Sequence, residues 1–175
     1  MTKILFICHG NICRSTCAHY VMQHMVDARG LGAEFFIDSA ATSREEIGNP
    51  VYPPMAQVLK SHGVPIGNHR ARQMTKQDYD DFDLLIGTDR ENLYFMNRMY
   101  GTVEKGDDRT AFWNYRYDDV TPTDPEGKIS LLLDHAPGRQ GEEVADPWYT
   151  RDFEVTYRDV VEGCTGLLRT LGYAG

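Results

Sequence analysis

Short apolar runs alternate with longer segments in which apolar residues recur at helical spacing. The runs predict four strands, namely KILFIC at 3–8, AEFFIDSA at 33–40, DLLIGT at 83–88 and KISLLL at 128–133. Helical spacing predicts helices from about 14 to 30, 53 to 63, 89 to 100 and 153 to 171. Because strands separated by helices pair in parallel with right-handed crossovers, we expect an α/β fold with a doubly wound, open, parallel four-stranded sheet and helices on both faces.

Length, composition and charge limit the number of domains and the classes of function that are possible. With 175 residues, of which 41% are hydrophobic, the chain can bury one full core, so we expect a single domain over 1–175. The net charge of −8 argues against a nucleic-acid-binding surface. No apolar run reaches membrane-spanning length and the N-terminus lacks a signal-peptide pattern, so we expect a cytoplasmic protein without membrane contact.

The connection over residues 99–127 is unusually long for a fold of this kind. It is rich in Asp but carries Phe112, Trp113, Tyr115 and Tyr117, which argue against simple disorder. It also leads directly into the predicted fourth strand. We therefore hypothesise that this extended connection packs beside a functional pocket as a lid or a partner-binding element.

The candidate catalytic residues lie in the stretch CHGNICRS, which begins at the last residue of the first predicted strand. Ligands in doubly wound sheets bind outside the carboxyl ends of strands, where Cys8 lies. Gly10 and Asn11 tolerate positive φ, so the segment can curl until its backbone N–H groups point to one centre. The following helix begins near Arg14, whose guanidinium can bind two phosphate oxygens. The sequence therefore predicts a phosphate-binding loop that also stabilises a thiolate at Cys8.

Two other interpretations of these cysteines are possible. A cysteine at the end of a strand is often only a small core residue. Alternatively, Cys8, His9, Cys13 and Cys17 could bind zinc, although their spacing lacks the Cys-x2-Cys pair and is divided by the start of a helix. The combination of strand, Gly-Asn, arginine, serine and helix start favours the phosphate-binding loop over both.

The motifs CHGNICRS, DSAATS, EIGNP and DPWY, in this order, resemble those of the low-molecular-weight protein tyrosine phosphatases. The resemblance covers about 3–98 and again 128–175, and it implies hydrolysis of phosphotyrosine through a phosphocysteine intermediate. It also implies that Cys8 is the nucleophile, that Arg14 holds the phosphoryl oxygens and that Asp146 is the general acid. The other residues that it places around the phosphate are His9, Gly10, Asn11, Ile12, Cys13 and Ser15, with Ser15 donating to the thiolate.

The same resemblance implies which residues support the loop, and it shows where this chain differs from the family. Ser39 and His69 are implied to hold the loop together with Asn11. Where the family often has an aromatic pocket wall after DSAATS, this chain has Arg44, Glu45 and Glu46, so the wall is expected from Glu45, Trp148 and Tyr149. His9 adds a titratable group beside the anion.

Related activities of the same fold stay open at this stage. A protein arginine phosphatase tends to carry threonine where this loop has Ile12, and an arsenate reductase would need a relay cysteine, for which only the distant Cys164 is available. A phosphopeptide-binding module would need neither nucleophile nor acid. A reversible disulfide between Cys8 and Cys13 is a further possibility. We expect no metal or cofactor, and phosphotyrosine-containing proteins or small aryl phosphates as partners.

Overall fold

One parallel sheet organises the chain in the computed structural model, which describes residues 1–100 and 124–173. Its strands are β1 (Thr2–Cys8), β2 (Phe35–Ala41), β3 (Leu84–Gly87) and β4 (Ile129–Leu131), arranged in the order β2-β1-β3-β4. All three neighbouring pairs are parallel. The predicted doubly wound sheet is therefore confirmed, while a single domain over 1–175 stays a prediction.

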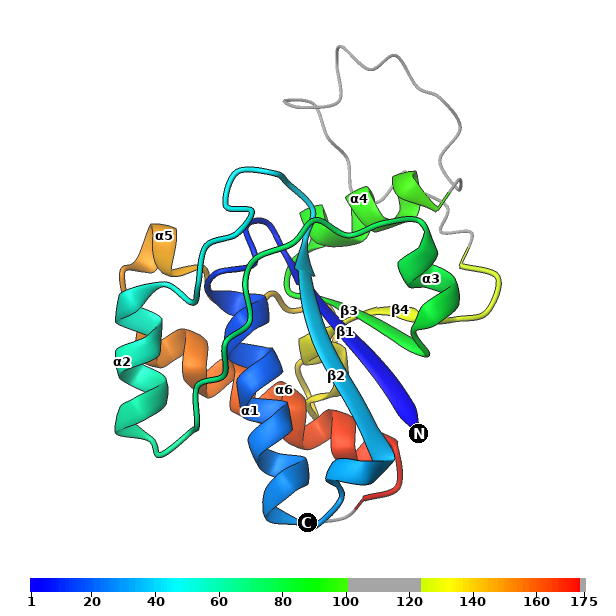
Figure 1. Cartoon of the computed structure of the whole chain (residues 1–175). Coiled ribbons are helices and arrows are strands. Elements are labelled where there is room, and N and C mark those ends of the chain that lie inside the picture. The colour runs from blue at the N-terminus through cyan, green and yellow to red at the C-terminus, as the bar shows by residue number, and fades with distance from the viewer. Residues whose placement is uncertain (101–123, 174–175) are drawn as a thin grey trace.

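Each face of the sheet is buried under helices, as its continuous apolar strands predict. Ile4 and Phe6 of β1 belong to one core cluster, and their neighbours Leu5 and Ile7 belong to a second one. Figure 1 shows α1, α2 and α6 on one side of the sheet and α3 and α4 on the other. The helices span α1 Arg14–Ala28, α2 Pro53–Ser61, α3 Gln77–Asp81, α4 Arg90–Met99, α5 Pro147–Thr150 and α6 Phe153–Thr170.

The structure departs from the sequence prediction in four elements. The predicted second strand begins two residues later, at Phe35, because a 3-10 helix, η1 (Gly32–Glu34), precedes it. The predicted fourth strand ends after Leu131, and the residues that follow form a 3-10 helix, η3 (Leu132–His135). Their apolar side chains are buried against α6 rather than in the sheet. The short helices α3 and α5 were not predicted, because four or five residues carry too little periodicity to be recognised.

Close packing of α6 against η3 depends on a glycine. A Cβ atom at Gly166 would lie 2.0 Å from the backbone oxygen of His135, and one at Gly163 would lie 2.5 Å from Cγ of Leu132. The neighbour at Gly166 is backbone, which cannot turn away as a side chain can. Glycine at this position therefore fixes how closely the last helix approaches the segment that leads to the candidate site.

Gly166→Ala tests this packing. Helix propensity alone would favour alanine by about 1 kcal/mol, but overpacking against backbone costs about 1–3 kcal/mol and occasionally more. We expect the clash to dominate and to lower the free energy of unfolding, measured by denaturant titration. Arg158→Ala, on the exposed face of the same helix, is the control and should change it little. A Gly166→Ala protein as stable as the wild type would contradict this account of the packing.

Candidate active site

The loop between β1 and α1 turns at Asn11, which has a φ of 58°. Asn is one of the few residues that adopt this left-handed conformation readily. Of the two residues expected to tolerate a positive φ, only Asn11 adopts it, and the missing side chain of Gly10 leaves room for Glu46, whose Cγ would lie 3.3 Å from a Cβ there. The reversal at Asn11 brings the loop back toward the end of β1.

The side chain of Asn11 is buried and hydrogen-bonded through both its oxygen and its nitrogen. Its Oδ1 accepts from the backbone N–H of Arg72 at 3.2 Å and lies 2.8 Å from Nε2 of His69. Its Nδ2 donates to Oγ of Ser15 at 2.9 Å. Because the N–H of Arg72 can only donate, it fixes which end of the amide is the oxygen. Asn11 therefore joins the loop, the start of α1 and the segment after α2.

Cys8 lies at the centre of this loop and is almost completely buried. Its Sγ is 3.0 Å from Oγ of Ser15 and accepts from the backbone N–H of Asn11 at 3.2 Å. Since Ser15 Oγ accepts from Asn11, its hydroxyl hydrogen is free to donate to the sulfur. Ser15 does not cap the helix, because the N-cap residue of α1 is Cys13, which makes no side-chain capping bond.

Arg14 is the first residue of α1 and is buried between two carboxylates. Its Nη1 donates to Oδ2 of Asp89 at 2.6 Å, and its Nη2 lies 3.4 Å from Oδ2 of Asp146. Burial opposes the charge on the guanidinium, but Cys8, Asp89 and Asp146 together outweigh burial and raise the pKa of Arg14. The arginine is thus a fixed cation whose orientation is set by Asp89.

Asp146 is held at the start of α5. It is the N-cap residue of that helix, and its Oδ1 accepts from the backbone N–H of Trp148 at 3.0 Å. Its other oxygen faces Arg14, so the carboxyl group points to the loop. Trp148 and Tyr149 are 80% and 82% exposed, which leaves both rings free to contact a ligand beside Asp146.

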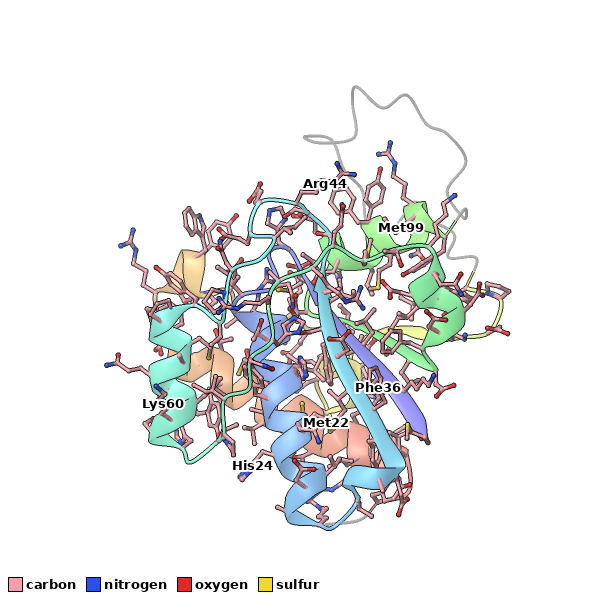
Figure 2. All side chains as sticks on the ribbon, viewed as in Figure 1. Met22, His24, Phe36, Arg44, Lys60 and Met99 are labelled. Carbon is pink, nitrogen blue, oxygen red and sulfur yellow. The ribbon has the colours of Figure 1, made fainter. Side chains whose placement is uncertain are left out.

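His9 and Glu45 form part of the rim of the site. Nε2 of His9 lies 3.1 Å from Oε2 of Glu45, and Nδ1 lies 3.3 Å from Oε1 of Glu91 in the first turn of α4. Arg44, next to Glu45, lies at the same end of the molecule as α4 and bonds to Gln73 (Figure 2). The histidine therefore links the loop after β2 to α4.

The remaining cysteines are poor candidates for zinc binding. Burial and the neighbouring Cys8 raise the pKa of the Cys13 thiol, against the opposing effect of Arg14. Cys17 is fully buried, and burial raises the pKa of its thiol as well. Among the described residues, the only group of three potential metal ligands close enough together is His19, Asp38 and His69. No three of Cys8, His9, Cys13 and Cys17 lie that close to one another in the part of the chain that the structure describes.

The predicted support residues meet behind the loop. Oγ of Ser39, on β2, lies 3.2 Å from Nε2 of His69, which is the nitrogen that reaches Asn11. Sequence reasoning did not predict that Asp89 bonds to Arg14, and it missed Arg72 as a partner of the loop. Asp89 could have been found from its place after β3, at the same carboxyl edge as Cys8. Nothing in the spacing of Arg72 indicates its contact with Asn11.

Two further expectations from the sequence concern the 99–127 connection and contact with a membrane. The aromatic residues of the 99–127 connection are outside the described residues, so its role as a lid or a partner-binding element stays a prediction. None of the helices in 1–100 and 124–173 combines the length and the apolar composition needed to cross a membrane.

Comparison with known proteins agrees with this geometry. A family model described as low molecular weight phosphotyrosine protein phosphatase matches residues 3–118. The chain is 32% identical to the low molecular weight protein-tyrosine-phosphatase YfkJ of Bacillus subtilis, with 98% of this chain and 96% of the relative covered. It is 35% identical to the human low molecular weight phosphotyrosine protein phosphatase, with 95% and 93% covered.

Solved structures give the same result. The crystal structure of Bacillus subtilis YfkJ superposes with a TM-score of 0.80 at 31% identity, covering 98% of this chain and 95% of that one. A Drosophila arginine phosphatase superposes with a TM-score of 0.78 at 28% identity, covering 97% and 98%. A parallel sheet with a cysteine-containing phosphate loop after its first strand defines a class of phosphatases. The chain belongs to the low molecular weight phosphotyrosine protein phosphatase family.

Asn11→Ala tests whether the shape of the loop depends on this side chain. Alanine in the left-handed conformation costs about 1–2 kcal/mol, and each buried group left without a partner adds about 1–3 kcal/mol. We expect a lower free energy of unfolding and weaker binding of inorganic phosphate, measured by denaturant titration and calorimetry. Asn68→Ala, at an exposed asparagine next to His69, is the control. Unchanged phosphate affinity in Asn11→Ala would show that the loop keeps its shape without the amide.

Proposed function

We propose that the protein hydrolyses phosphotyrosine with Cys8 as the nucleophile, Arg14 as the phosphate-binding cation and Asp146 as the general acid. The observation that carries the proposal is the convergence of these three side chains. The sulfur of Cys8 has two donors, one from Ser15 and one from the backbone of Asn11, and Arg14 at the next helix start faces Asp146. Nucleophile, anion site and acid are thus held by three different segments at one edge of the sheet.

In the first step, the thiolate of Cys8 attacks phosphorus and the bond from phosphorus to the phenolic oxygen breaks. The electron pair of that bond leaves with the tyrosyl oxygen, which takes the proton of Asp146 as it departs. The donors from Ser15 and Asn11 stabilise the thiolate before attack. The products of this step are tyrosine and a phosphocysteine.

In the second step, water attacks the phosphocysteine and returns the enzyme to its starting state. Asp146, now a carboxylate, accepts a proton from the water as the new phosphorus–oxygen bond forms. The phosphorus–sulfur bond breaks and its electron pair returns to Cys8 as thiolate. Inorganic phosphate is released, and no metal or organic cofactor takes part in either step.

Arg14 supplies the charge that both steps need. A guanidinium can donate two parallel hydrogen bonds to the equatorial oxygens of the phosphoryl group, where charge develops in the transition state. Asp89 orients the arginine from one side through the 2.6 Å bond to Nη1. We therefore assign Asp89 a positioning role, since it acts through Arg14.

Single residues distinguish the proposed activity from the other activities known for this fold. The similarity to an arginine phosphatase keeps phosphoarginine as a second substrate to assay, although Ile12 favours phosphotyrosine. For an arsenate reductase, the relay would fall to Cys164, which is fully buried on α6 and whose thiol pKa is raised by that burial. A binding module without turnover would need neither Cys8 nor Asp146.

The proposal extends to substrates and location. Trp148 and Tyr149 are exposed beside Asp146 and can stack on the ring of a phosphotyrosine, with Glu45 on the opposite rim. We propose phosphotyrosine-containing proteins or small aryl phosphates as substrates and a cytoplasmic location. A disulfide between Cys8 and Cys13 stays a prediction.

Cys8→Ser tests the nucleophile. The serine hydroxyl is a far weaker nucleophile, so hydrolysis of a phosphotyrosine peptide should fall to the background rate. Binding of phosphate or vanadate should persist, because Arg14 and the backbone N–H groups remain, and calorimetry measures it. Phosphoserine and phosphoarginine peptides assayed with the wild type, without added metal, define the substrate class. A Cys8→Ser enzyme with substantial turnover would refute the mechanism.

Asp146→Asn tests the acid and separates an enzyme of this kind from a binder with a reactive cysteine. Loss of a positioned acid should slow phosphotyrosine hydrolysis by about 10²–10⁴-fold. The loss should be smaller for aryl phosphates whose phenol is already acidic, since a good leaving group needs little help. The alkaline limb of the rate profile should also flatten. If the mutant kept the leaving-group dependence and the alkaline limb of the wild type, the acid would be elsewhere, with His9 or Asp89 next to be tested.

A further inference from the structure

Three side chains from separate segments meet behind the phosphate loop. His19 comes from α1, Asp38 from β2 and His69 from the segment after α2. One ligand atom from each lies within 4.8 Å of the other two, and Nδ1 of His69 is 3.5 Å from Oδ1 of Asp38. The two imidazole rings pack edge to face at 5.0 Å. Two histidines and one carboxylate are a common ligand set for transition metals.

The hydrogen bonds of Asn11 decide which nitrogen of His69 can bind a cation. Because Oδ1 of Asn11 can only accept, Nε2 of His69 at 2.8 Å carries the hydrogen and donates it. Nδ1 is then the nitrogen left to face Asp38. In the neutral imidazole, this nitrogen presents a lone pair to a carboxylate, and a cation between them would relieve the repulsion.

Both histidines lie in surroundings that disfavour their charged forms. Burial and the nearby His69 lower the pKa of His19 to about 4, against the opposing effect of Asp38. Burial also lowers the pKa of His69, with Asp38 opposing and Arg72 adding to the effect. The hydroxyl of Ser39, 2.9 Å from Nδ1 of His19, can donate or accept and so does not fix the tautomer of that ring.

Asp38 offers one oxygen to the cluster. Its Oδ2 bonds to the guanidinium of Arg72, while Oδ1 accepts from the backbone N–H of Ser39 at 2.8 Å and faces His69. Arg72 is itself paired with Asp78 at 3.1 Å, so part of its positive charge is offset. The carboxylate is thereby oriented for a second partner on the side of Oδ1.

A cavity reaches two of the three residues of the cluster. Its volume is about 370 Å³, and both His19 and His69 line it. His24, five residues further along α1, lines it as well and is labelled in Figure 2. A hydrated ion could reach the two imidazoles without passing through the phosphate loop, and water could complete its coordination.

We propose that His19, Asp38 and His69 bind one divalent transition-metal ion of the zinc type at a site separate from the catalytic cysteine. The bond from Nε2 of His69 to Asn11 is then the outer contact that metal-binding histidines usually make, which fixes ring orientation. Metal binding at Nδ1 holds His69 in the tautomer that Asn11 requires. Occupancy therefore stabilises the support of the phosphate loop.

The test uses Zn²⁺ and Co²⁺ with a Cys8→Ser, Cys13→Ser protein, so that the thiols of the loop cannot bind the ion. Calorimetry with Zn²⁺ should show one equivalent bound, and the melting temperature should rise with Zn²⁺. Co²⁺ should give visible absorption without a thiolate charge-transfer band. His19→Gln in the same background should weaken Zn²⁺ binding by about 100-fold or more and abolish the thermal shift. His24→Gln, in the same cavity but outside the cluster, is the matched control and should bind like its parent.

Three results would overturn the proposal. They are no stoichiometric Zn²⁺ binding in the parent, equal affinity in His19→Gln and the parent, and loss of binding in His24→Gln. Circular dichroism establishes that each variant is folded, and Asp38→Asn serves as the second variant if His19→Gln is not. Because binding and melting are measured without turnover, failure here would leave the proposed hydrolysis untouched.

Discussion

The left-handed turn at Asn11 is the constraint on which the rest of the site depends. It points a backbone N–H at Cys8, and the same residue's side chain orients Ser15 toward the sulfur. Asn adopts this conformation more readily than most residues, but the preference of one residue does not by itself fix the shape of a whole loop. Here the holding contacts come from His69 and the backbone of Arg72, both far away in sequence. The loop is therefore shaped by tertiary contacts and not by its own sequence alone.

The charge of Arg14 is likewise balanced by residues that are distant in sequence. Arg14 is buried at the start of α1, where a lone cation would be unfavourable, and Asp89 and Asp146 make it tolerable. Asp89 follows β3 at the carboxyl edge of the sheet, and the backbone N–H of Val144 donates to the carbonyl of Thr88 at 2.9 Å, which holds the segment before Asp146 beside it. In the proposed cycle, one acid orients the arginine and the other handles the proton. The fold therefore places at one site both the acid that orients the arginine and the acid that transfers the proton.

The pattern of residues along the chain predicted those parts of the structure that depend on short stretches of sequence. Apolar runs identified the strands, and the strand, Gly-Asn and Arg sequence located the phosphate loop. The resemblance to a family supplied Ser39 and His69, which spacing alone could not have found. The end of β4 was missed because Leu132 is apolar whether it is buried by the sheet or by α6. Arg72 was missed because its contact with Asn11 uses the backbone, which no residue type reveals.

The most direct measurement of the central claim is the chemical identity of the covalent intermediate. Wild-type enzyme mixed with a phosphotyrosine peptide would be quenched with acid within a turnover, digested and examined by mass spectrometry. The account predicts one phosphoryl group on the peptide that contains Cys8, bound through sulfur. A phosphoryl group on His9 instead, or none on any residue while turnover proceeds, would contradict it.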